Sequence, residues 1–245
     1  NMAGHSHWAG IKHKKGRQDN LRSKLFSKLS REITVAAKLG AKDPASNPRL
    51  RSAIQSARQS NMPKDNIERA IKKSEFGAEQ NYENLRYEGY GPFNVAIIIE
   101  ALTDNKNRTA SKIRTILQKF GGSLGENGST SHLFSNYGII QIKVDELSEE
   151  KILETAIKSG SLDCTFNNKI SEVVCKKEDF YKVKNEFEKL NMEFLFSGIE
   201  WRAKSLIDFS KEQNIKIVEM IDKLNEEDDV QNIFLNCNIR ELNNL

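Results

Sequence analysis

The sequence has few of the features that mark a secreted, membrane-spanning or disulfide-bonded protein. It contains three cysteines in 245 residues, Cys164, Cys175 and Cys237, which lie far apart and form no C-x-x-C pair. We interpret them as reduced core residues. No run of eighteen apolar residues is present, and no charged segment at the start precedes an apolar stretch with a cleavage site. We therefore expect a soluble cytoplasmic protein.

Common enzyme signatures are also absent. There is no G-x-x-x-x-G-K-[ST] phosphate loop, no G-x-G-x-x-G run, no H-E-x-x-H pair and no G-x-S-x-G elbow. The glycine-rich stretch 121–128 follows an expected helix, which favours a hairpin turn over a nucleotide cradle. His5, His7 and His13 could gather a metal, but no Cys or acid stands at ligand spacing. We predict no catalytic residues, no cofactor and no metal.

Positive charge is concentrated at the amino-terminal end. Residues 1–80 hold 17 Lys or Arg against 7 Asp or Glu, whereas the whole chain has a net charge of only +4. A polycation joined to a mildly acidic body is typical of proteins that meet phosphate, although an acidic protein patch or an anionic membrane could also attract it. The alternative is a solvated tail that binds nothing. Trp8 favours binding, because a solubilising tail does not need a large stacking ring among its cations.

The predicted nucleic-acid contacts comprise this basic arm and the cations of the helix that follows it. They are His5, Ser6, His7, Trp8, Lys12, His13, Lys14, Lys15, Arg17, Arg22, Lys24, Lys28 and Arg31. Residues 1–16 have no sustained periodicity and contain three glycines, which predicts a flexible arm. From about Asp19, apolar residues recur every four positions until Gly40. On that helix Lys24, Lys28 and Arg31 fall opposite the apolar arc, so we expect them on an outer face.

Residues 17–82 are expected to form a three-helix basic domain. Asn47-Pro48 supplies a cap and a first-turn proline for the second helix, and Asn61-Met62-Pro63 restarts the pattern for a third. Three short amphipathic helices can bury their apolar stripes only as a bundle. Such bundles include DNA readers, but no recognition helix stands out, and a packing role is the alternative.

The rest of the chain predicts an α+β class with one domain inserted in another. Residues 136–203 read as strand, helix, two strands, helix and strand, a ferredoxin-like order. Residues 83–135 and 204–245 supply a second such order, with a buried strand at 95–102 and further strands at 131–134, 206–209 and 230–235. Residues 76–84 read as a polar linker. In this domain Asp104, Asn105, Arg108 and Glu126 are candidates to line a cleft, although capping and turn roles are the simpler explanation.

Several long motifs follow one another along residues 2 to about 240. They are MAGHS at 2–6 with Trp8, IKHKK at 11–15, REITVAA at 31–37, NPRLR at 47–51, NMPKDNI at 61–67, YEGYGP at 87–92, EALTDN at 100–105, NRT at 107–109 and DDVQN at 228–232. In these motifs the sequence resembles the YebC/PmpR family. The sequence departs from the family pattern in two places: His7 stands where Lys is common, and Phe93-Asn94 replaces a glycine-rich pair.

The resemblance implies a probable transcriptional regulatory protein with three domains around a cleft, whose mitochondrial relatives are translational activators of cytochrome c oxidase. It also implies that the arm carries the contact residues. Some members are linked to DNA, and others to the ribosome, where they assist synthesis of proline-rich sequences. We expect a non-enzymatic, monomeric nucleic-acid-binding regulator and favour ribosomal RNA or tRNA as its partner, since a Trp-, His- and Lys-bearing arm suits irregular RNA. Duplex DNA is the alternative partner, and a cleft enzyme acting on RNA or nucleotides is a third possibility.

Overall fold

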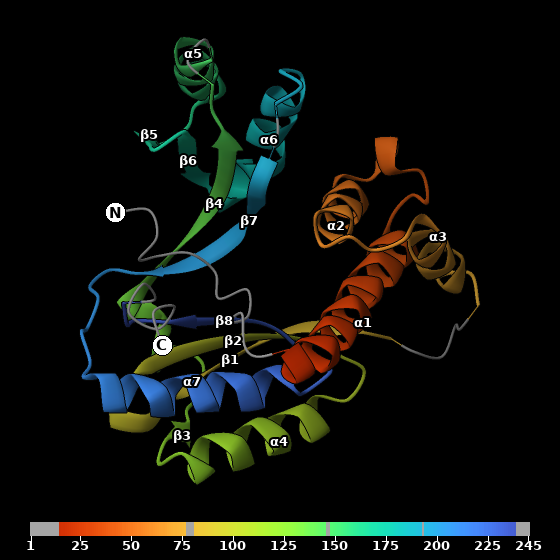
Figure 1. The fold of residues 1–245 in the computed structure, drawn as a ribbon. Helices are drawn as coiled ribbons and strands as arrows, with labels where there is room; N and C mark the ends of the chain where they lie inside the picture. The colour runs from red at the N-terminus through yellow and green to blue at the C-terminus, as the bar shows by residue number, and fades with distance from the viewer. Residues whose placement is uncertain (1–14, 77–80, 146–147, 193, 239–245) are drawn as a thin grey trace. The chain divides into compact units, whose positions relative to one another are not determined.

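The computed structural model describes residues 15–76, 81–145, 148–192 and 194–238, with side chains from Arg22 onward (Figure 1). It divides into two compact units. The first holds the described residues up to Phe134 together with those from Ala203, and the second is Ser135–Arg202. Helices and antiparallel sheets are both present, so the predicted α+β class is confirmed. No described helix combines the length and apolar character that crossing a membrane requires.

The first unit begins with three helices, α1 (Lys15–Leu39), α2 (Pro48–Gln59) and α3 (Lys64–Lys73). The side chain of Asn47 caps α2 by accepting from the Leu50 amide at 3.1 Å, and Pro48 occupies the first turn as expected. A 3₁₀ turn, Pro44–Ser46, precedes this cap. The apolar stripes of the three helices meet in one core that includes Ile33, Leu50 and Ile67.

A four-stranded sheet follows in the same unit, in the order β3-β1-β2-β8. Its strands are β1 (Glu83–Tyr90), β2 (Ala96–Thr103), β3 (Ser123–Leu124) and β8 (Val230–Leu235). Two helices, α4 (Lys106–Lys119) and α7 (Lys211–Asn225), lie on one face of the sheet (Figure 1). They bury Ile113, Leu117 and Ile221 against the β2 and β8 side chains. Together these residues form the main apolar core of the unit.

Two strand predictions in this sheet were wrong. Residues 206–209 form no strand and make only an isolated bridge, between Ile207 and Cys237. The neighbour that β2 has along its full length is instead β1. The strand expected at 131–134 is instead a 3₁₀ turn, Ser131–Leu133, that leads into the next strand. The amides of Thr130 and Ser131 are taken by the buried Glu88 carboxylate, at 3.1 and 2.6 Å, and are therefore unavailable to a strand ladder.

The second unit contains α5 (Glu149–Ser159), β5 (Asp163–Asn167), β6 (Ile170–Lys176) and α6 (Phe180–Glu188), together with all but the first residue of β4 (Phe134–Lys143) and all but the last residue of β7 (Phe194–Ala203). Its sheet order is β5-β6-β4-β7, with β4 and β5 both antiparallel to β6. This is the predicted β-α-β-β-α-β sequence of elements. The helices α5 and α6 cover one face of the sheet and share a core with it that includes Ile142, Val173 and Phe187.

The turn between β1 and β2 contains the Phe93-Asn94 departure. Both residues have positive φ, 59° and 58°. This left-handed region favours glycine, because a Cβ crowds the following carbonyl there. The ring of Phe93 packs 6.3 Å from that of Phe209, and the Lys216 ammonium lies 5.9 Å from the Phe93 ring.

Candidate nucleic-acid interface

The predicted arm lies mostly outside the described residues. This applies to His5, Ser6, His7, Trp8, Lys12, His13 and Lys14. Lys15 and Arg17 lie in the first turns of α1, and their side chains are also outside the description. Arg22 is exposed, and its guanidinium lies 5.3 Å from the Phe26 ring centroid.

The remaining predicted cations of α1 contact the part of the same unit that contains the β3-β1-β2-β8 sheet with α4 and α7, which we call the sheet domain. Lys24 pairs with Asp228 at 2.7 Å. Lys28 donates to the Asn225 carbonyl at 2.7 Å, and Arg31 pairs with Asp229 at 2.9 Å. These side chains therefore hold α1 against the end of α7 and the turn before β8.

Lys28 corrects the expectation of an outward-facing row of cations. It is only 7% exposed. Burial lowers its pKa to about 8, against the opposing attraction of Asp228. Its partner Asn225 ends α7, where the last carbonyls have no partner within the helix and the dipole favours a cation. The helical pattern correctly separated these cations from the face of α1 that packs in the bundle core. The face that carries them is not free, however, because it lies against the end of α7 and the turn before β8.

Three of the four predicted cleft residues gather around Asp229. Arg108 bonds Asp104 at 2.9 Å and Asp229 at 3.1 Å, and Asn105 caps α4 through the Arg108 amide at 3.0 Å. Thr109 also donates to Asp229, at 2.8 Å. Burial would raise the pKa of Asp229, but the hydrogen bonds from Thr109, Arg31 and Arg108 outweigh it and lower that pKa. The cluster is thus a satisfied ion-pair network.

Glu126 lies apart from that network. It follows β3, where Leu124 pairs with Gly89, whereas Asp104 follows Thr103, which pairs with Glu83 at the other end of β1. Six residues of strand separate the two positions, roughly 20 Å at the usual rise. Glu126 is also exposed.

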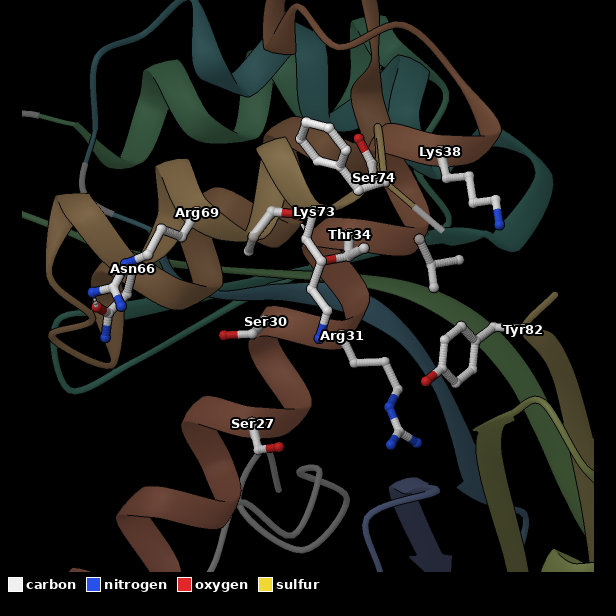
Figure 2. A pocket seen from close by; sticks show the side chains of 13 residues that line it. Ser27, Ser30, Arg31, Thr34, Lys38, Asn66, Arg69, Lys73, Ser74 and Tyr82 are labelled. Atoms are coloured by element: carbon white, nitrogen blue, oxygen red, sulfur yellow. Dashed lines mark hydrogen bonds between the residues drawn. The ribbon is translucent and has the colours of Figure 1, made fainter. Parts of the chain in front are cut away.

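A pocket of about 420 Å³ opens between α1 and α3. The α1 side supplies Ser27, Ser30, Arg31, Thr34 and Lys38, and the α3 side supplies Asn66, Arg69, Ala70 and Lys73. Figure 2 shows Lys73 extending from α3 toward α1, with the Tyr82 ring on the side of Arg31. Phe76 and Tyr82 complete the wall. We call this cavity the α1–α3 pocket.

The lining of the α1–α3 pocket has four cations, Arg31, Lys38, Arg69 and Lys73, and no Asp or Glu. The Lys73 ammonium and the Ser30 hydroxyl have no hydrogen-bond partner within the described part of the chain. Cations beside hydroxyl donors and aromatic rings are the chemistry that binds phosphate groups and bases. The pocket can therefore hold an anion without first losing a lining carboxylate.

Sequence reasoning missed Arg69 and Lys73 as site residues. Both were visible as cations at a spacing of four on the third helix, with Asn66 three residues before Arg69. The spacing i, i+3, i+7 places them on one face, but only packing reveals that this face borders a groove on α1. No group of three or more potential metal ligands occurs among the residues that the structure describes.

Comparisons with known proteins cover nearly the whole chain. Residues 6–77 match the model of the TACO1/YebC protein N-terminal domain, and residues 82–237 match that of the TACO1/YebC second and third domain. A probable transcriptional regulatory protein of Pelagibacter ubique is 54% identical over 239 residues, 98% of this chain and 99% of the relative. The crystal structure of a conserved hypothetical protein from Aquifex aeolicus superposes with a TM-score of 0.76 at 44% identity, covering 95% of this chain and 96% of that one. The resemblance read from the sequence motifs is thereby confirmed: this chain belongs to the TACO1/YebC family.

Proposed function

We propose that this protein is a non-enzymatic regulator of gene expression that binds nucleic acid through its helical domain, with ribosomal RNA or tRNA as the favoured partner. The observation that carries the proposal is the α1–α3 pocket, where four cations and no carboxylate line one cavity. The basic arm adds cations next to this domain in the sequence. Phosphate neutralisation by such groups supplies most of the affinity of sequence-independent nucleic-acid binding.

RNA is preferred over duplex DNA on physical grounds. Irregular RNA exposes bases that can stack on aromatic rings, and both the pocket, with Tyr82 and Phe76, and the arm, with Trp8, offer such rings beside cations. A duplex keeps its bases stacked and paired, so it is bound mainly through contacts between cations of the protein and the phosphates on its outer surface. On the ribosome, such a protein would assist synthesis of difficult, proline-rich sequences.

A DNA-binding transcriptional regulator is the second candidate. It is favoured by the name of the Pelagibacter ubique relative, a probable transcriptional regulatory protein. The three-helix domain would then lie along duplex phosphates. An enzyme is a third hypothesis, centred on Asp104 and Arg108, but both groups are engaged in the ion-pair network with Asp229.

The deciding experiment measures binding of the full chain to purified ribosomes, to tRNA and to duplex DNA at physiological salt. We expect association with ribosomes or tRNA and only weak, sequence-independent duplex binding. Submicromolar duplex binding with sequence preference, and no ribosome association, would refute the favoured partner and support the transcriptional role. Turnover of RNA that disappears in Asp104→Ala while binding survives would refute the non-enzymatic assignment.

A further inference from the structure

Arg31 is bound in an unusual, one-sided way. Its Nη1 atom donates to the Leu102 carbonyl at 3.0 Å, to the Asp228 carbonyl at 3.1 Å and to Asp229 Oδ1 at 2.9 Å. Its Nε and Nη2 atoms donate to no group within the described residues. One nitrogen thus takes three acceptors while the other edge of the guanidinium keeps its donors.

The unused edge is the one suited to an oxyanion. Nε–H and Nη2–H are parallel donors that match two oxygens of a phosphate, and this bidentate geometry is why Arg is common in phosphate sites. Arg31 lines the α1–α3 pocket, and its side chain is 19% exposed. Its guanidinium also lies 5.0 Å from the Tyr82 ring centroid, which restricts its plane further.

We propose that the α1–α3 pocket binds a phosphate of an unpaired nucleic-acid strand, held by the Nε–Nη2 edge of Arg31 together with Lys73. The Nη1 contacts to the sheet domain fix that edge before the ligand arrives, so little side-chain entropy is lost on binding. This inference rests on the proposed function and specifies its site. The pocket volume of about 420 Å³ suits one nucleotide unit.

An unpaired strand fits this site better than a duplex. The phosphate site is recessed between two helices and has aromatic walls at Phe76 and Tyr82. A single strand can direct one phosphate inward and place the adjoining base against a ring. A duplex keeps its bases stacked and paired, so it could offer only a phosphate from its outer surface.

Lys73→Ala tests the pocket without endangering the fold, because Lys73 is exposed. Its matched control is Lys72→Ala, the exposed neighbour on α3 that does not line the pocket. The probe is a short oligouridylate, with binding measured by fluorescence anisotropy at several salt concentrations. Losing one phosphate contact lowers the slope of log affinity against log salt concentration by about 0.7. When the salt concentration is raised fourfold, the affinity of the variant should therefore fall by a factor roughly 2.6 times smaller than that of the wild type. We expect that change for Lys73→Ala and little change for Lys72→Ala.

Arg31→Lys tests the bidentate geometry separately from charge. It keeps the positive charge but cannot present two parallel donors while contacting the sheet domain, so we expect about tenfold weaker oligouridylate binding with a nearly unchanged salt slope. Circular dichroism checks that the variant folds. In the wild-type protein, the ¹⁵Nε resonance of Arg31 should shift on titration with oligouridylate, and this measurement needs no substitution.

The outcomes separate the two levels of inference. If no nucleic acid binds the wild-type protein, both the proposed function and this site are overturned. If a strand binds but affinity is insensitive to Lys73→Ala and Arg31→Lys, only the site is overturned. Duplex binding as tight as strand binding would overturn the assignment to an unpaired strand, and equal affinity for uridine monophosphate would make the pocket a free-nucleotide site instead.

Discussion

Replacing Glu88 with Gln should destabilise the first unit in a strongly pH-dependent way. The Glu88 side chain is fully buried, and its carboxylate accepts from the amides of Gly128, Thr130 and Ser131 at 2.8, 3.1 and 2.6 Å. Arg86 contributes a further contact at 3.2 Å. Gln has one acceptor oxygen, and its NH₂ group would face an amide donor, so at least one buried N–H would lose its partner.

The pKa of Glu88 sets the size and the pH range of the effect. Burial by itself would raise this pKa, but the backbone hydrogen bonds from Gly128, Ser131 and Thr130 overcome it and lower the value from 4.5 to about 2. A tenfold change in proton affinity is worth about 1.4 kcal/mol, so the ionised form contributes roughly 3 kcal/mol to folding. Because the folded pKa is depressed, that contribution is complete above pH 4.5 and is lost as pH falls toward 2.

Urea unfolding followed by circular dichroism at a series of pH values from 7 to 3 measures this difference. Wild type should exceed Glu88→Gln by up to about 3 kcal/mol at pH 7, and the gap should narrow below pH 4.5. Glu126→Gln is the control, since Glu126 is exposed and its side chain makes no hydrogen bond or ion pair among the described residues. A gap that stays constant down to pH 3, or none at pH 7, would refute the role assigned to the carboxylate.

Three further substitutions test other parts of the first unit. Wild type should gain stability relative to Lys28→Met as pH rises from about 8 to 10.5 in unfolding titrations, because the folded state releases the buried Lys28 proton first; a parallel pH dependence would contradict this. Asn47→Asp keeps the cap acceptor but loses two donors to carbonyls, at 2.8 and 2.7 Å, and should cost about 2 kcal/mol in urea melts, whereas a neutral result would show that the cap alone matters. Phe93→Gly should be more stable than Phe93→Ala by about 1 kcal/mol, since both lose the ring but only glycine relieves the positive φ; equal stabilities would remove strain from the explanation.

The spacing of apolar residues predicted the helices well, because a helix that buries one face needs an apolar residue every three to four positions. The helix expected after Asn47-Pro48 is α2 (Pro48–Gln59), which begins at the predicted cap and packs its apolar residues into a core. The sheet was harder. β1 (Glu83–Tyr90) is largely polar, and its first two residues fall in the predicted linker. The strand nevertheless holds a central position in the sheet through backbone hydrogen bonds, which side-chain hydrophobicity does not predict. The stretch 206–209, with three apolar residues of four, resembled a strand, but it contributes only a single bridge.

The site shows a related limit of sequence reasoning. Counting cations predicted one continuous basic surface on α1, whereas Lys24, Lys28 and Arg31 each bond a backbone carbonyl or a carboxylate of the same unit. Charge along a helix therefore has to be divided between internal contacts and contacts available to a partner, and only packing makes that division. Arg31 belongs to both classes, because one nitrogen is committed to the sheet domain while its other edge is not. A residue of this kind would link nucleic-acid binding to the attachment of α1 to the sheet. Asp229→Asn, which weakens the contact with Arg31, should therefore reduce the affinity of the pocket for oligouridylate in fluorescence anisotropy, even though the substitution removes a negative charge.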